Sequence, residues 1–253
     1  MPFADAGGYD LLEIRGEGLF NVISTVSKAR IAVEKDRAAA VRAKLEELSR
    51  RIRQVYESTD PDMQIEIAEE PVEPEARRLA PAVKENLLAL IYTAPVGMHK
   101  PMNTPCTLAC SSSNLGSLKE ENGTLCLVMS IRSNPEYRHD QLLRIYELLC
   151  ASAGARMVTD RRIASWEYNP DSPLREKACE VYAAQNGRPP ELIWVHSGVE
   201  VATFLTKLRS QGREADAIAF GCRIENAHSP EEALEIASLA KTYRFLTGLL
   251  EVL

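Results

Sequence analysis

The first part of the chain alternates between strand-like and helix-like arrangements of apolar residues. Residues 9–15 and 22–33 are rich in β-branched and apolar side chains, which predicts two strands. An amphipathic helix is predicted next, because apolar residues recur every three or four positions with charged residues between them. The apolar positions are Ala38, Val41, Leu45, Leu48, Ile52 and Val55. Leu45 and Leu48, in the middle of this series, are predicted to be core residues.

Five further elements complete this region. Residues 62–68 alternate between apolar and polar, as a half-buried strand does. After an acidic connection, the apolar positions 79, 83, 87 and 91 predict a second helix, and residues 136–153 a third. Residues 104–118 and 124–131 predict paired strands, because the intervening Asn122-Gly123 is typical of a hairpin turn. The pattern predicts an α+β fold in which helices cover one face of an antiparallel sheet.

From about residue 172 the pattern changes. Helix-like stretches at 173–185, 199–209 and 230–250 alternate with the apolar segments 192–195 and 217–220. Short, almost continuously apolar strands between helices are typical of a parallel α/β layer. We therefore predict two domains, one over residues 1–168 and one over residues 169–253.

The amino-acid composition indicates which classes of protein and partner to expect. The 253 residues are 45% hydrophobic and 26% charged, with a net charge of −6, which is typical of a soluble globular protein. A basic excess is missing, so we expect no nucleic acid partner. No apolar run approaches the roughly 20 residues that span a bilayer, and the start lacks a signal-peptide pattern, so we expect a cytoplasmic protein with no membrane partner. The six cysteines form no CxxC pair and are predicted to be reduced and mostly buried thiols.

Two histidines follow the predicted parallel strands, at the edge where open α/β sheets bind ligands: His196 after residues 192–195, and His228 after residues 217–220. Ser229, Pro230 and Glu232 suit a capping box at the start of the last helix. The helix dipole would then favour a neutral imidazole at His228, which is the form that binds a metal. The alternative is that His228 only hydrogen-bonds its loop and that His196 belongs to an ordinary strand-to-helix turn.

Other candidate groups carry weaker signals. Gly198 either gives a ligand room to approach the backbone or belongs to an ordinary strand-to-helix turn. His99 and His139 lie in polar contexts and are predicted to be solvated. One good histidine is too few for a metal site, which needs at least three protein ligands.

Four segments resemble aminoacyl-histidine dipeptidases, also called cytosol nonspecific or Xaa-His dipeptidases, of the dinuclear zinc aminopeptidase and carboxypeptidase clan. They are IRGEGLFNVIS at 14–24, SSSNLGSLKEENGTLCLVMSIRS at 111–133, and HSGVE with AFGCRIENAHSPEE at 196–200 and 219–232. The resemblance implies that residues 1–168 are the family's lid domain. Residues 169–253 would then be the α/β segment that ends its zinc-peptidase catalytic domain.

The resemblance also implies roles for four residues. His228 matches the family's last zinc ligand, and Gly198 matches a glycine that lines the substrate site. Asn21 and Arg132 match lid residues that hold the substrate, and the fork of a guanidinium suits the terminal carboxylate of a peptide. Around Asn21, RGEGLFN departs from the family's RGG-x-x-RN pattern.

The implied function is hydrolysis of Xaa-His and other dipeptides, in which two zinc ions polarise the scissile carbonyl and activate a water molecule. The family dimerises through its lid, so we expect a homodimer with a dipeptide substrate. The family's HxD motif, glutamate pair and further aspartate, which supply the other zinc ligands, have no match in these 253 residues. We therefore expect this chain to be inactive alone. The alternative is a non-catalytic dimerisation or binding module derived from the lid.

Overall fold

A computed structural model describes residues 8–20, 22–101, 109–134, 136–160, 162, 164–193, 200–227 and 230–253. The chain divides into two compact units, each built from separate stretches of sequence. The first unit comprises Met1–Val96, Asn114–Ser130 and Tyr146–Met157, and the second comprises Gly97–Ser113, Ile131–Ile145 and Val158–Leu253. The predicted domain border at residue 168 stays a prediction.

An antiparallel sheet is the main β structure. Its strands are β1 (Asp10–Glu17), β2 (Val26–Ala32), β3 (Gly97–Pro101), β4 (Ala109–Glu121) and β5 (Thr124–Ser133). The strand order is β2-β1-β4-β3, and β5 also pairs with β4. Strands β1 and β2 pair along most of their length, whereas β1 meets β4 at Gly16 and Leu118. The predicted α+β class with an antiparallel sheet is confirmed.

The β4–β5 hairpin forms as predicted. Its two-residue loop is Asn122-Gly123, with φ angles of 50° and 78°. Both values are positive, which a type I′ turn requires and which asparagine and glycine tolerate best. The twist of this turn matches that of the strands, so it fixes the pairing of the two strands.

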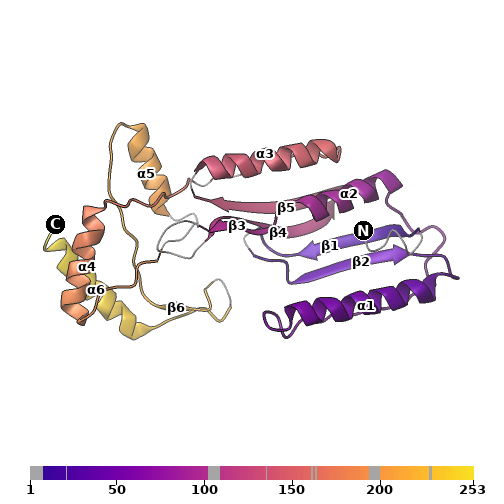
Figure 1. The fold of residues 1–253 in the computed structure, drawn as a ribbon, viewed down its shortest axis with the longest axis horizontal. Coiled ribbons are helices and arrows are strands. Elements are labelled where there is room, and N and C mark those ends of the chain that lie inside the picture. The colour runs from indigo at the N-terminus through magenta and orange to yellow at the C-terminus, as the bar shows by residue number, and fades with distance from the viewer. Residues whose placement is uncertain are drawn as a thin grey trace. The chain divides into compact units, whose positions relative to one another are not determined.

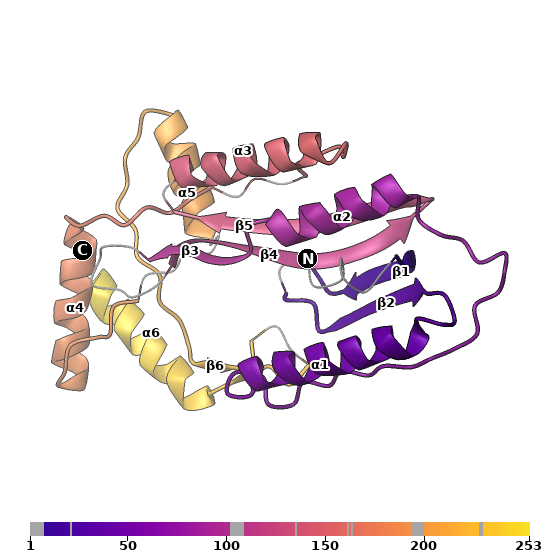
Figure 2. The ribbon, with the colours of Figure 1, turned by 45° about the vertical axis from the view of Figure 1, so that its right-hand side comes forward.

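Helix α1 (Ala38–Tyr56) runs beside β2 in both views (Figures 1 and 2). Val41 is buried, as its position predicts, but Leu45 and Leu48 are only half-buried, which corrects the prediction. The other two helices of this region are α2 (Pro81–Thr93) and α3 (Glu136–Ser152), and the buried side chains of α2 are Leu87 and Leu90.

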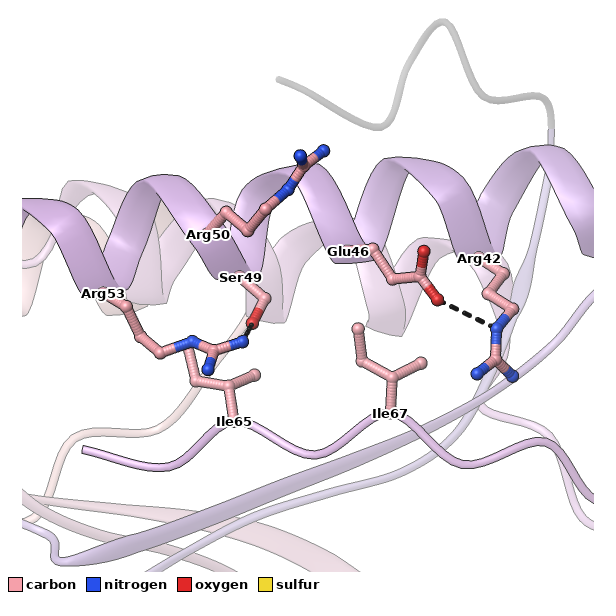
Figure 3. Close-up of a pocket in the computed structure, with 7 residues that line it drawn as sticks. All are labelled: Arg42, Glu46, Ser49, Arg50, Arg53, Ile65 and Ile67. Carbon is pink, nitrogen blue, oxygen red and sulfur yellow. Dashed lines mark hydrogen bonds and ion pairs between the residues drawn. The ribbon is translucent and has the colours of Figure 1, made fainter. Parts of the chain in front are cut away.

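Residues 62–68 do not form the predicted strand, because no described strand pairs with them. Their alternation has another cause: Ile65 and Ile67 point toward α1 and are half-buried against it (Figure 3). A shallow hollow of about 520 Å³ lies between this segment and the helix, lined by Arg42, Glu46, Ser49, Arg50, Arg53, Ile65 and Ile67. None of the sequence-predicted site residues lines it.

The C-terminal part of the second unit contains α4 (Pro173–Asn186), α5 (Glu200–Ser210) and α6 (Ile236–Leu250). The Ser172 hydroxyl caps α4 by accepting the Arg175 backbone N–H at 3.1 Å, and Gly187 ends the helix with φ 71°. Helices α4 and α6 pack side by side around a small core of Ala178, Phe245 and Leu249. The predicted positions of α4 and α5 are confirmed to within one residue at each end.

Two predicted elements of this region are wrong. Residues 217–220 form no strand, since they have no ladder partner among the described residues, and Ile218 packs against the α4–α6 core instead. Helix α6 begins at Ile236 rather than 230, because the preceding residues form a hairpin of β6 (Ile224–Glu225) and β7 (Ala233–Leu234). Helix α6 therefore does not begin at the predicted Pro230, and Glu235 is its N-cap residue. Ser229, the predicted cap, lies outside the described residues.

One face of α6 is largely exposed. Five large apolar side chains spaced three and four positions apart are exposed along it: Ile236, Leu239, Tyr243, Leu246 and Leu250. The helix is thus apolar on two neighbouring faces, and the face with Phe245 and Leu249 packs against α4. In the described ranges, no helix is long and apolar enough to cross a membrane.

Asp216 joins the residues before α4 to the 217–220 segment. Its carboxylate accepts hydrogen bonds from the Ser172 hydroxyl at 2.7 Å, the Leu174 backbone N–H at 3.1 Å, the Ala217 backbone N–H at 3.0 Å and the Asn169 amide at 3.3 Å. Burial acts to raise the pKa of Asp216, but the bonds from Ser172 and the other donors outweigh it and lower the pKa.

We expect Asp216→Asn to destabilise the α4–α6 region by about 1–2 kcal/mol at pH 7, the low end for charged hydrogen bonds because the group is partly exposed. A carboxyl with a lowered folded pKa contributes stability above its unfolded pKa, and loses that contribution as the pH falls through the folded value. The stability difference between wild type and variant, followed by thermal unfolding, should therefore shrink at acidic pH. Asp171→Asn, an exposed neighbour, is the control; an equal difference at all pH values would contradict the assignment.

Candidate functional site

Arg132 is the predicted site residue that the structure describes. It is the next-to-last residue of β5, and its side chain is exposed. Within the described part of the chain, no carboxylate forms an ion pair with it. Its guanidinium is therefore available to bind an anion, and the planar fork suits a carboxylate.

The chain directly after Arg132 is buried. Ser133 and Asn134 are 7% and 3% exposed. The Ser133 carbonyl accepts a hydrogen bond from the Ser165 hydroxyl at 2.8 Å, and the Asn134 side-chain amide donates to the Trp166 carbonyl. The end of β5 is thus fastened to a segment more than thirty residues further along the chain.

The first turn of α3 is fastened to the same segment. The Arg162 guanidinium lies 2.7 Å from a carboxylate oxygen of Glu136 and 2.7 Å from one of Asp140. The two carboxylates lie four positions apart in sequence, on one face of the helix, so one guanidinium reaches both.

Two histidines of the second unit are partly buried, which corrects the prediction that they are solvated. His99 Nε2 lies 2.7 Å from the Ser113 hydroxyl oxygen. Burial, helped by Arg138, lowers the pKa of His99. Burial and then Arg162 lower the pKa of His139, against smaller opposite effects of nearby carboxylates. Both imidazoles are consequently neutral at pH 7, so neither supplies positive charge for a carboxylate ligand.

In the first unit, the loop between β1 and β2 lies against β4. A Cβ atom on Gly18 would come within 2.4 Å of the Gly116 carbonyl oxygen, and one on Gly116 would come within 2.7 Å of the Leu19 carbonyl oxygen. The Asn114 side-chain amide also donates to the Val22 carbonyl at 2.8 Å. The loop that carries Asn21 is therefore held to β4 on both sides of that residue.

The contact between this loop and β4 gives a structural role to two segments of the sequence. IRGEGLFNVIS supplies the loop, and the Asn114 and Gly116 of SSSNLGS hold it. Sequence reasoning did not select Asn114, Gly116 or Ser165 as supports of the site. Asn114 and Gly116 belong to a segment that resembles the dipeptidase family, but Ser165 carries no local signal.

Three predicted site residues, Asn21, Gly198 and His228, lie outside the described residues, as does His196. The structure describes the loop around Asn21 in the first unit and Arg132 in the second. Among the residues that it describes, no group of three or more histidine, cysteine, aspartate or glutamate side chains is placed to hold a metal ion.

Comparison with known proteins identifies the family. The sequence profile of peptidase family M20/M25/M40 matches residues 28–252, which is most of the chain. The chain belongs to this family. The chain is 21% identical over 241 residues to the cytosol non-specific dipeptidase of Escherichia coli (strain K12). That similarity covers 95% of this chain and 48% of the relative.

The M20/M25/M40 fold is supported by a solved structure, the aminoacylhistidine dipeptidase from Vibrio alginolyticus. The TM-score is 0.81 at 21% sequence identity, and the match covers 97% of this chain and 49% of the other. Both comparisons confirm the resemblance to aminoacyl-histidine dipeptidases that the sequence indicates. This family member spans about half the length of the relatives that it matches.

Proposed function

We propose that these 253 residues provide the lid domain and the last part of the catalytic domain of a zinc-dependent dipeptidase that hydrolyses Xaa-His and other dipeptides. The family match over residues 28–252 carries the proposal. The exposed Arg132 at the end of β5, without an ion-pair partner among the described residues, supports it. Arg132 would bind the terminal carboxylate of the dipeptide, with Asn21 and Gly198 as further substrate contacts.

The described residues do not fit a complete zinc site. Zinc takes three or four protein ligands, and no group of that size occurs among them. His228 is one proposed ligand, and we derive no catalytic step through the metal. The remaining ligands are proposed to come from polypeptide equivalent to the other half of the relatives, about half of whose length this chain matches.

The exposed stripe of α6 is consistent with that proposal. Its side chains are large and apolar, and none of the five is charged. Interfaces of this composition resemble a domain core cut in half, and they are typical of permanent rather than transient contacts.

We further propose that the assembled protein is a cytoplasmic homodimer joined through the lid.

We expect the chain alone to bind zinc weakly, because His228 is its one proposed ligand. Metal analysis after dialysis against a mild chelator would measure this, with the Escherichia coli dipeptidase treated in parallel as the reference. Two zinc ions retained per chain would contradict the proposed division of ligands.

The function itself is tested by Xaa-His hydrolysis, assayed for the chain alone and mixed with an N-terminal half of a family member. We expect activity only in the mixture, and we expect Arg132→Gln to reduce it mainly by raising KM. Arg50→Gln, an exposed arginine on α1, is the matched control. A chain that folds and associates with the added half but gives no hydrolysis would favour the alternative, a non-catalytic dimerisation or binding module.

A further inference from the structure

Arg132 stands where a strand ends, so its own secondary structure does not hold it firmly. It is followed by a single further residue of β5, Ser133. A strand end frays unless other contacts fix its backbone, whereas a group that binds a carboxylate bidentately must be presented in one orientation. The contacts that fix residues 133 and 134 therefore bear on what Arg132 can do.

Those contacts come from one segment. The Ser165 hydroxyl donates to the Ser133 carbonyl at 2.8 Å, and the next residue, Trp166, accepts from the Asn134 amide through its carbonyl. Ser133 and Asn134 are both more than nine-tenths buried, so water does not readily replace these bonds. The same segment is anchored to α3 through Arg162.

We propose that Ser165 and Asn134 are positioning residues for Arg132, and that they set how tightly it binds the terminal carboxylate of a dipeptide. This inference rests on the proposed function, in which Arg132 is the carboxylate-binding residue. Neither positioning residue touches the substrate. They act by holding the backbone on the C-terminal side of the arginine, so that its guanidinium spends less time in unproductive orientations.

The test compares two probes on the full chain, glycyl-L-histidine and glycyl-L-histidinamide, which differ only in the terminal carboxylate. The ratio of their dissociation constants, from NMR titration, reports carboxylate recognition and is insensitive to a general loss of folded protein. We expect wild type to prefer the acid, and Arg132→Gln to abolish the preference. Ser165→Ala should reduce the ratio about fivefold, as expected for one lost hydrogen bond.

Two variants act as controls. Ser165→Thr keeps the hydroxyl and should restore the ratio to within about twofold of wild type. Ser210→Ala removes a serine-to-carbonyl hydrogen bond of the same kind, 2.8 Å long, on α5, and should leave the ratio unchanged. If Ser165→Ala does not fold, Ser165→Cys gives the same comparison, because a thiol of similar size is a weaker donor.

The outcomes separate the two proposals. If wild type shows no preference for the acid, or if Arg132→Gln keeps it, the proposed role of Arg132 is wrong and the positioning role falls with it. If Arg132→Gln abolishes the preference but Ser165→Ala retains it, Arg132 binds the carboxylate and the positioning role of Ser165 is overturned.

Discussion

Phe245→Ala should lower the free energy of unfolding of the α4–α6 pair by about 3–5 kcal/mol, the range for truncating a buried aromatic residue. Phe245 is 9% exposed and belongs to the core between the two helices. Its ring meets Phe220 edge-on at 4.7 Å between centroids and Tyr182 at 5.8 Å. Truncation would leave a cavity and remove both aromatic contacts, which add to the cost of lost burial.

Hydrogen exchange of α6 amides measures this effect locally, which matters because a chain with two compact units need not unfold in one step. Tyr243→Ala is the matched control, since Tyr243 lies on the same helix but is 68% exposed. Its cost should stay within about 0.5 kcal/mol. Equal protection of α6 amides in wild type and Phe245→Ala would show that α4 and α6 are not packed as described.

Gly18→Ala is expected to have the next largest effect, a loss of about 3 kcal/mol. The new Cβ would lie 2.4 Å from the Gly116 carbonyl oxygen and 3.2 Å from the Ser24 Cα. Both neighbours are backbone atoms, so the strain is relieved only if the loop moves away from β4. Differential scanning calorimetry would give the loss of stability, and backbone amide chemical shifts of Leu19, Phe20 and Val22 would report the displacement.

Gly8→Ala is the control for this variant, because a Cβ atom on Gly8 meets nothing within 4 Å. It should leave both stability and the loop shifts unchanged. If Gly18→Ala behaves like Gly8→Ala, the loop does not lie against β4, and the support inferred for the Asn21 loop is absent.

The sequence predicted correctly those features that a few neighbouring residues determine. Asn122-Gly123 predicted the β4–β5 turn because few other residue pairs adopt two positive φ angles without strain. The start of α4 was predicted at Pro173, and Ser172 caps it. These features depend on a few neighbouring residues, which is why sequence alone sufficed.

Features that depend on distant partners were missed. Residues 62–68 have the alternation of a strand, but pairing needs a neighbour, and the segment covers α1 instead. The helix start at Pro230 was predicted wrongly, because β6 pairs with β7 and α6 begins only at Ile236. In the candidate site, Arg132 was predicted from the family resemblance. The hydrogen bond from Ser165 to Ser133, beside Arg132, joins residues 32 positions apart, and no local pattern reveals it.

The Asn122-Gly123 turn also affects the order in which the strands pair during folding. A hairpin closed by two residues forms in about 1–10 μs, because little chain entropy is lost in bringing its ends together. The pairing of Gly16 with Leu118 joins residues about 100 positions apart, and contacts of such separation slow folding strongly. The β4–β5 hairpin is therefore expected to exist as a nucleus before β1 arrives. The β1–β2 loop, which carries Asn21, then docks on a strand already in place, and substitutions at Gly18 should speed unfolding far more than they slow refolding.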